Sequence, residues 1–256
     1  MNVLEQIVIS TKKRVEKEKR AGLPPKSTVK RQPFTFEKGL RGADISFICE
    51  VKKASPSKGI IAENFPYLDI AREYEAAGAY AISVLTEPEF FKGSNEHLAE
   101  IRKVVGIPLL RKEFIIDKFQ IEQSFLLGAD AILLICSILT PRKLADFIKE
   151  ADGFGMSCLV EVHDEDELRM AVEAGARVIG VNNRDLRSFE VDTGNSIRLS
   201  KLAPKETIFV SESGIRTPED VELLRKNGID AVLVGEVLMR SADKKAALAA
   251  LRGGRG

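Results

Sequence analysis

The sequence predicts an α/β fold, a single (β/α)8 barrel (TIM barrel) that carries an N-terminal helical extension. The length of 256 residues is close to the roughly 250 residues of one such barrel. A unit made of an amphipathic stretch and an apolar run recurs along the chain. Polar residues or glycine stand at the downstream ends of the apolar runs, at Glu50, Lys112, Glu161, Asn182, Glu212 and Gly235. Barrels of this kind collect their chemistry at the carboxyl ends of their strands, so these endings predict one shared site.

The recurring unit predicts parallel strands that alternate with helices. The amphipathic stretches end at a glycine, which supplies the left-handed residue that closes a helix, at Gly78, Gly128, Gly175 and Gly228. The apolar runs are nearly continuous, as in strands that are buried on both faces. We expect strands at about 45–52, 79–85, 107–112, 130–136, 157–162, 177–182, 207–212 and 230–235. An open doubly wound sheet would use the same pattern, but polar ends on both early and late strands favour a closed barrel.

Capping residues mark where several helices begin. Thr140 and Thr217 each precede a proline, and a threonine N-cap with proline at the first helical position is a start signal. Asp117 and Asp164 are expected to cap two further helices.

No Pro-rich or Ser-rich segment divides the chain, so we expect one domain over residues 1–256. Residues 1–44 form the N-terminal helical extension, 45–252 the barrel and 253–256 a flexible tail. An apolar stripe predicts a helix near the start of the chain, and Phe36 and Leu40 predict a second, short helix. Periodicity alone leaves open whether this extension plugs the floor of the barrel or covers its mouth.

The charge balance argues against a nucleic-acid or membrane partner. The chain has 39 basic and 38 acidic residues, a net charge of +1. Basic residues crowd between Lys12 and Arg31, where we expect a solvated helix face rather than a binding arm. No apolar stretch reaches the roughly 20 residues of a membrane span, and the N-terminus does not read as a secretory signal. We expect a small phosphorylated molecule as partner, and a monomer with a weak dimer as the alternative.

The cysteines predict a reducing, cytoplasmic location. Cys49, Cys136 and Cys158 are odd in number, form no close pair and lie in expected strands, which is typical of small buried side chains. There is no CxxC motif, and His97 and His163 are far apart, which argues against zinc. Sequence alone leaves open a magnesium site made of carboxylates.

Ionisable side chains are expected to gather at the barrel mouth, at Glu50, Lys52, Lys112, Glu161 and Glu212. Residues two apart on a strand share a face, so Glu50 and Lys52 point the same way. Any single pair of an acidic and a basic side chain in this set is explained equally well as a structural ion pair. The whole set predicts acid–base chemistry, because desolvating so many ionisable groups is costly.

A phosphate site is expected after the last two strands. Ser213 and Gly214 follow the seventh strand, and Gly235 follows the eighth and precedes a short helix, where barrels commonly bind phosphate through backbone N–H groups. Ser55 could add a hydroxyl across the mouth, or belong to an ordinary turn. His163 lies two residues past Glu161, and we expect it to belong to a loop that caps a helix rather than to take part in catalysis.

The blocks ICEVKKASPSKG, LLRKEFIID, CLVEVH, IGVNNRDL, VSESGI and AVLVGEVLM occur in this order and resemble the indole-3-glycerol phosphate synthase family. The resemblance runs from the N-terminal helix to about residue 240. It implies ring closure, decarboxylation and dehydration of 1-(2-carboxyphenylamino)-1-deoxyribulose 5-phosphate, a carboxy-lyase reaction of tryptophan biosynthesis that needs neither cofactor nor metal. It also implies that the extension covers the active mouth.

The resemblance further implies residue roles. Lys112 matches the general acid on the ribulose carbonyl, and Glu161 its partner in the loss of water. Glu50 matches a second essential carboxylate, Lys52 the group that binds the substrate carboxylate, and Asn182 an orienting residue. The remaining matches are Glu212 in the polar network, Ser55, Arg184, Ser213, Gly214 and Gly235 around the phosphate and ribulose, and Phe91, Phe114, Leu133 and Leu186 as apolar walls.

Two positions depart from the family pattern. Glu113 stands where many members have aspartate, and we expect its side chain to point away from the mouth. Glu236 stands where some members have serine, so phosphate would bind its backbone N–H while its side chain turns to solvent.

Two other classes of function stay open at this stage. One is another phosphosugar barrel enzyme, a phosphoribosylanthranilate isomerase or a Schiff-base aldolase. The other is a reconstructed or designed barrel scaffold without activity, or a non-catalytic phosphosugar binder.

Overall fold

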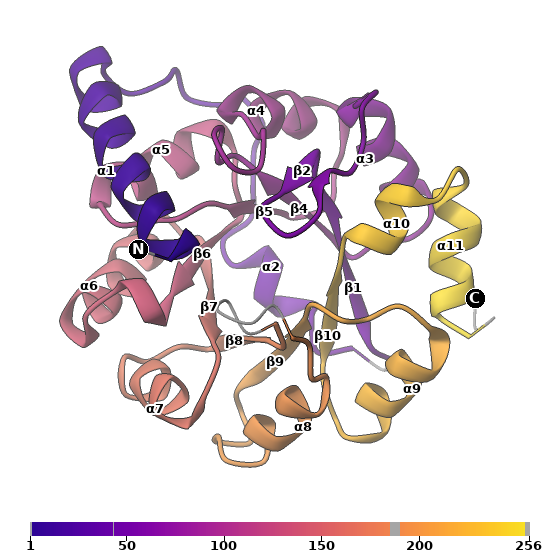
Figure 1. Ribbon diagram of the computed structural model, residues 1–256. Helices are drawn as coiled ribbons and strands as arrows, with labels where there is room; N and C mark the ends of the chain where they lie inside the picture. Colours follow the sequence, from indigo (N-terminus) through magenta and orange to yellow (C-terminus); the bar gives the residue numbers. More distant parts are fainter. Residues whose placement is uncertain (1, 43, 185–189, 254–256) are drawn as a thin grey trace.

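The computed structural model describes residues 2–42, 44–184 and 190–253. Within these residues, eight parallel strands close into a barrel in the order β1-β10-β9-β8-β7-β6-β5-β4 (Figure 1). They are β1 (Ser46–Val51), β4 (Ala81–Leu85), β5 (Leu109–Lys112), β6 (Ala131–Ile135), β7 (Ser157–Val162), β8 (Val178–Asn182), β9 (Ile208–Glu212) and β10 (Ala231–Val234). Each lies within two residues of its expected bounds, and the closed barrel is confirmed.

Helices follow each strand of the barrel and surround it (Figure 1). They are α3 (Tyr67–Ala76), α4 (Asn95–Val104), α5 (Lys118–Leu127), α6 (Pro141–Gly153), α7 (Glu165–Glu173), α8 (Gly194–Ser200), α9 (Pro218–Lys226), α10 (Glu236–Arg240) and α11 (Lys244–Leu251). The four expected caps are confirmed, since Asp117, Thr140, Asp164 and Thr217 each accept a backbone N–H of their helix. The four expected helix-ending glycines all have positive φ.

The expected strand at 130–136 extends one residue too far at each end. β6 ends at Ile135, and Cys136 begins a 3-10 helix, η1 (Cys136–Ile138). Cys136 remains buried, as do Cys49 and Cys158, so the expected burial of the cysteines is confirmed. Among the described residues, no helix is long and apolar enough to cross a membrane.

The N-terminal extension contacts both ends of the barrel. Helix α1 (Val3–Ala21) contributes Val3, Leu4 and Ile7 to the cavity described below. The short helix α2 (Thr35–Lys38) places Phe36, which is fully buried, in the interior cluster with Ala81 and Ala231, the first residues of β4 and β10. Plug and cover were alternatives on periodicity alone, whereas α2 fills the floor and α1 borders the mouth.

The basic segment from Lys12 to Arg31 is mostly exposed, with two exceptions. Arg14 Nη2 donates to Glu113 Oε1 at 2.9 Å. Arg31 donates to the backbone oxygens of Phe125 and Ala129. These two arginines therefore attach the extension to the barrel, which the expectation of a solvated helix face had missed.

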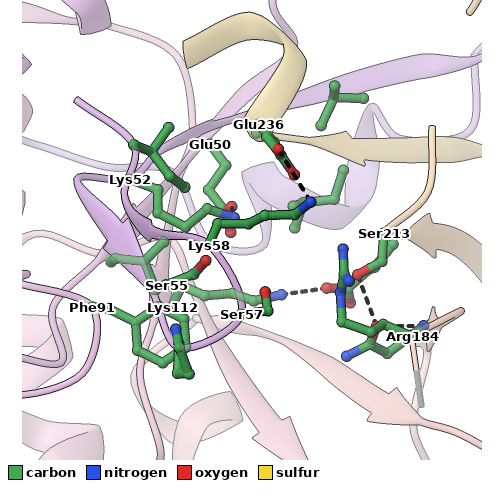
Figure 2. A pocket seen from close by; sticks show the side chains of 18 of the residues that line it. Glu50, Lys52, Ser55, Ser57, Lys58, Phe91, Lys112, Arg184, Ser213 and Glu236 are labelled. Atoms are coloured by element: carbon green, nitrogen blue, oxygen red, sulfur yellow. Dashed lines mark hydrogen bonds and ion pairs between the residues drawn. The ribbon is translucent and has the colours of Figure 1, made fainter. Parts of the chain in front are cut away.

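A small hairpin follows β1. Strands β2 (Ala54–Ser55) and β3 (Gly59–Ile60) pair antiparallel across a turn. Ser55 is buried, and the turn carries Lys58 over the carboxyl end of the barrel (Figure 2).

Candidate active site

The strand register brings the expected ionisable groups to one end of the barrel. Lys112, Asn182 and Glu212 are the last residues of β5, β8 and β9. Glu50 and Glu161 are one residue from the ends of β1 and β7. All five line one cavity of about 380 Å³, within the usual range for small-ligand sites.

The ammonium group of Lys112 lies among three carboxylates. It contacts Glu212 Oε2, and its Nζ is 3.7 Å from Glu161 Oε2. Burial lowers the pKa of Lys112, but the carboxylates of Glu212, Glu161 and Glu50 more than offset this, and the pKa is raised above its ordinary value. Lys112 therefore stays protonated at neutral pH.

Glu212 is nearly inaccessible to solvent, with a side chain that is 3% exposed. Burial raises its pKa to about 7, because the attraction of Lys112 does not compensate for desolvation and for repulsion from Glu161. Its Oε1 has no hydrogen-bond partner among the described residues. One carboxyl group of the cluster can thus take up a proton near neutral pH.

Two glycines make room for these carboxylates. A Cβ at Gly180 in β8 would overlap Glu212 Oε1, and one at Gly235 would overlap Glu50 Oε2. Gly235 was expected in the site through its backbone. Gly180 was missed, and its only signal was a glycine inside an apolar strand, which is typical of a close approach by another group.

The second ion pair of the mouth joins residues two apart on the sequence. Lys52 Nζ contacts Glu50 Oε2, as their shared face predicted (Figure 2). Their side chains are 18% and 5% exposed. Asn182 donates from Nδ2 to Glu161 Oε1 at 3.4 Å and accepts from Ser213 Oγ at 2.9 Å, so it connects the acid cluster to the loop after β9.

The loop after β9 has backbone N–H groups in an unusual conformation. Ser213 and Gly214 have φ values of 66° and 87°, and a non-glycine residue in the left-handed region carries strain that is often found at functional sites. The backbone oxygen of Ser213 accepts from Asn183 Nδ2 at 3.2 Å. On the neighbouring strand β10, Gly235 precedes α10 without a side-chain cap in the described chain.

Several cations border this end of the cavity. Arg184 was expected there, whereas Lys58, Arg216 and Arg240 were not singled out from the sequence. Lys58 lies in the quoted SPSKG block, but its position depends on the β2–β3 hairpin.

The expectation that the Glu236 side chain turns to solvent is wrong. Its Oε1 lies 3.8 Å from Lys58 Nζ and accepts from Arg240 Nε at 3.2 Å (Figure 2). The side chain is only 32% exposed, because the hairpin after β1 brings a lysine within reach.

Glu113 borders the cavity, but its carboxylate turns away from Lys112. It accepts from Arg14 Nη2 at 2.9 Å and from Thr86 Oγ1 at 3.0 Å. The orientation expected for Glu113 is therefore confirmed.

The other end of the cavity is apolar. Phe91, Phe114 and Leu133 line it, and the two phenylalanine rings lie with centroids 5.9 Å apart. Leu186, the fourth expected wall residue, lies outside the described residues. A molecule with an aromatic part and an anionic part would match the two ends of this cavity.

His163 lies in the loop that begins α7, as favoured by the sequence. Its backbone N–H donates to Glu167 Oε2 at 2.8 Å. Within the described part of the chain, no group of three or more histidine, cysteine, aspartate or glutamate side chains is placed to hold a metal ion.

Comparison with solved structures supports the fold. A 3-hexulose-6-phosphate synthase aligns with a TM-score of 0.67 and 16% sequence identity, covering 83% of this chain and 100% of that one. A structure described as native KDPGal aligns with a TM-score of 0.59 and 17% identity, covering 83% of this chain and 95% of that one. At this identity the likeness is one of fold alone.

Comparison of sequences is more specific. Residues 4–251 match the family model for indole-3-glycerol phosphate synthase. The chain is 56% identical to indole-3-glycerol phosphate synthase of Ruminiclostridium cellulolyticum, with 98% of this chain and 99% of that protein aligned. It is 53% identical to the enzyme of the same name from Endomicrobium trichonymphae, over 94% and 96%. With nearly its whole length matched, the chain belongs to the indole-3-glycerol phosphate synthase family.

Proposed function

We propose that this protein closes and decarboxylates 1-(2-carboxyphenylamino)-1-deoxyribulose 5-phosphate to indole-3-glycerol phosphate, with release of CO2 and water. The observation that carries the proposal is the convergence of Lys112, Glu161, Glu212 and Glu50 in one cavity of a chain from this family. The cavity joins an apolar end to a cationic end, and the substrate joins an aromatic ring to a phosphate.

The phosphate binds at the ends of β9 and β10. Backbone N–H groups of Gly214, Gly235 and Glu236 would donate to its oxygens, as barrels commonly arrange after these strands. The Ser213 hydroxyl and the cation of Arg184 support the same end from the cavity wall. Ser55 would add a donor from across the mouth.

The anthranilate ring binds at the opposite end, between Phe91, Phe114 and Leu133. Because the two ends hold the substrate at once, the flexible ribulose is brought to the ring carbon that attacks it. Lys52 would bind the carboxylate that leaves as CO2, and Asn182 would orient the ribulose.

Lys112 acts as general acid in the first step. The ring carbon attacks the ribulose carbonyl carbon, negative charge develops on the carbonyl oxygen, and an ammonium stabilises and protonates it. The raised pKa of Lys112, held by its carboxylate neighbours, supports this role because the group must carry its proton when substrate binds.

The later steps need the carboxyl groups. Loss of CO2 restores the aromatic ring, and the new hydroxyl then leaves as water after protonation. The neighbouring ring carbon loses a proton as the water departs, and the carboxylate of Glu161 would accept this proton, with Glu50 as the second carboxylate. Glu212, whose pKa burial raises to about 7, completes the network as a group that can exchange a proton at neutral pH.

The reaction requires no cofactor, and a small phosphorylated molecule is the partner. The expectations of a monomer and of a cytoplasmic location stay predictions.

Turnover tests the proposal directly. The chain contains no tryptophan, so indole fluorescence from the product rises over a dark protein background. Purified protein with substrate should give this signal together with one CO2 for each product molecule. Absence of both signals would reject the proposal. Reduction with borohydride in the presence of substrate should leave Lys112 unlabelled, and a trapped adduct would indicate Schiff-base chemistry instead.

A further inference from the structure

The carboxylate of Glu161 has a cationic neighbour at each oxygen. Lys112 Nζ lies 3.7 Å from Oε2, on the side of the cavity. His163 Nε2 lies 3.6 Å from Oε1, on the side of α7. The first neighbour belongs to the proposed reaction, whereas the second has no part in it so far.

The ring of His163 is fixed by the start of α7. Its Nδ1 lies 3.0 Å from Glu167 Oε2, and the same oxygen accepts the His163 backbone N–H at 2.8 Å. Asn195 Nδ2 donates to the backbone oxygen of His163 at 2.9 Å. With Nδ1 paired in this way, Nε2 is directed to Glu161.

The imidazole carries a positive charge at neutral pH. Burial lowers the pKa of His163, but the hydrogen bond to Glu167 and the carboxylates of Glu161, Glu167 and Glu212 raise it to about 9. Its Nε2 is buried and has no hydrogen-bond partner in the described chain. The charge at Nε2 therefore acts mainly on the nearest carboxylate, that of Glu161.

We propose that His163 is a positioning residue for the reaction, an imidazolium held by Glu167 that orients the carboxylate of Glu161 towards Lys112. The inference rests on the proposed function and adds to it a residue that does not touch the substrate. It assigns a cation to each oxygen of Glu161, so that this carboxylate does not depend on Lys112 alone, which also contacts Glu212.

Other charged groups surround His163 and act on the same equilibrium. They are Asp164 in its own loop, Glu212 on β9, and Glu5, Lys12, Arg184, Glu190 and Asp192 around the neighbouring cavity. Their sum leaves the imidazole dominated by Glu167 and Glu161, the carboxylates nearest to its two nitrogens.

The first test uses linkage between the two groups and needs no turnover. The chain has two histidines, so His97→Gln leaves His163 as the single imidazole for an NMR titration. The pKa of His163 should fall by about one pH unit when Glu161→Gln is added, because an opposite charge nearby favours the charged form. Adding Glu167→Gln should also lower it. A change of less than about 0.3 with Glu161→Gln would overturn the proposal.

The second test is the pH dependence of turnover. The imidazolium loses its proton as the pH rises through about 9, so the kcat of the wild type should fall over this interval. His163→Gln should lower kcat at neutral pH and remove this alkaline fall. KM should stay within about twofold, because His163 does not line the substrate cavity. Glu167→Gln should move the alkaline fall to lower pH, because Glu167 raises the pKa of His163.

A purely structural role gives a different result. His163→Gln would then lower thermal stability and scale kcat equally at every pH, with the alkaline fall of the wild type retained, and that outcome contradicts the proposal. If the wild-type protein makes no indole-3-glycerol phosphate, the proposed function fails, while the NMR titration still decides whether His163 and Glu161 are coupled.

Discussion

Lys112 Nζ, at the end of β5, lies 3.7 Å from Glu161 Oε2, near the end of β7, although the two residues are 49 positions apart in the sequence. The closed barrel explains this approach, because the carboxyl ends of all its parallel strands face one mouth. The pair joins the group proposed to protonate the carbonyl oxygen to the group proposed to act in the loss of water. The geometry of this mouth leads to the predictions below.

Gly180→Ala should damage activity from within the barrel wall. The added methyl group would overlap Glu212 Oε1, so the carboxylate must move away from Lys112. We expect kcat to fall by roughly 100-fold, the contribution of a positioned acid or base, with about 1–3 kcal/mol of lost stability from overpacking.

Gly153→Ala is the matched control for this change. No atom lies within 4 Å of the added Cβ, and Gly153 is the last residue of α6. Activity should be unchanged and the free energy of unfolding unchanged or higher. Equal kcat in the Gly180→Ala variant and the wild type would show that activity does not require the position of the Glu212 carboxylate beside Gly180.

Lys58 and Glu236 should have opposite effects on phosphate affinity. Lys58→Ala removes a cation from the phosphate end, so KM and the inhibition constant of inorganic phosphate should rise by roughly 10-fold. Glu236→Gln removes a repelling charge and releases Lys58, so the phosphate inhibition constant should fall by roughly threefold.

The exposed Lys103→Ala serves as control for loss of a positive charge. Equal weakening of phosphate inhibition by Lys58→Ala and by Glu236→Gln would contradict this prediction. It would show that the two residues support the site as an ion pair, and that Glu236 does not compete with phosphate for Lys58.

Arg14→Ala should destabilise the fold by about 3 kcal/mol. The change leaves the fully buried carboxylate of Glu113 without its closest cation, and a buried charge that loses its partner is costly. Chemical denaturation would measure the loss. Arg72→Ala, which breaks an ion pair with Asp69 whose side chains are 53% and 68% exposed, should change stability by less than about 1 kcal/mol. Equal effects would contradict the assigned role of Arg14.

His163 should contribute stability that depends on pH. Its folded-state pKa is raised from 6.5 to about 9, because its carboxylate partners outweigh burial. The contribution is therefore complete below about pH 6.5 and is lost as the pH rises through about 9, with a total of about 3 kcal/mol. The stability difference between wild type and His163→Gln should shrink over this interval. A difference that is constant from pH 6 to 9.5 would contradict the account.

His97 gives the control of opposite sign. Burial lowers its pKa, so its contribution to stability should diminish as the pH falls, and His97→Gln should remove that loss.

Sequence reasoning located the strand ends because they are local. Lys112, Asn182 and Glu212 each end an apolar run, and closure of the barrel is sufficient to bring them together. Likewise, Asp164 caps α7 through a contact three residues away. Features of this kind depend on few neighbours along the chain.

The features that were missed depend on approaches between distant segments. Arg14 and Glu113 are 99 positions apart and pair because α1 packs against α5, beside the end of β5. Gly180 accommodates a side chain from the next strand, and Lys58 meets Glu236 through the β2–β3 hairpin. No local periodicity carries this information, so the Glu236 side chain was wrongly expected to turn to solvent.

Product formation by the wild type and by Lys112→Ala, measured side by side as the rise of indole fluorescence, tests the central claim most directly. Lys118→Ala, which removes a lysine that is 57% exposed on α5, is the control. We predict full activity in the wild type and in the control, and a loss of at least roughly 100-fold in kcat for Lys112→Ala with substrate still bound. Near-normal kcat in the Lys112→Ala variant would contradict the account.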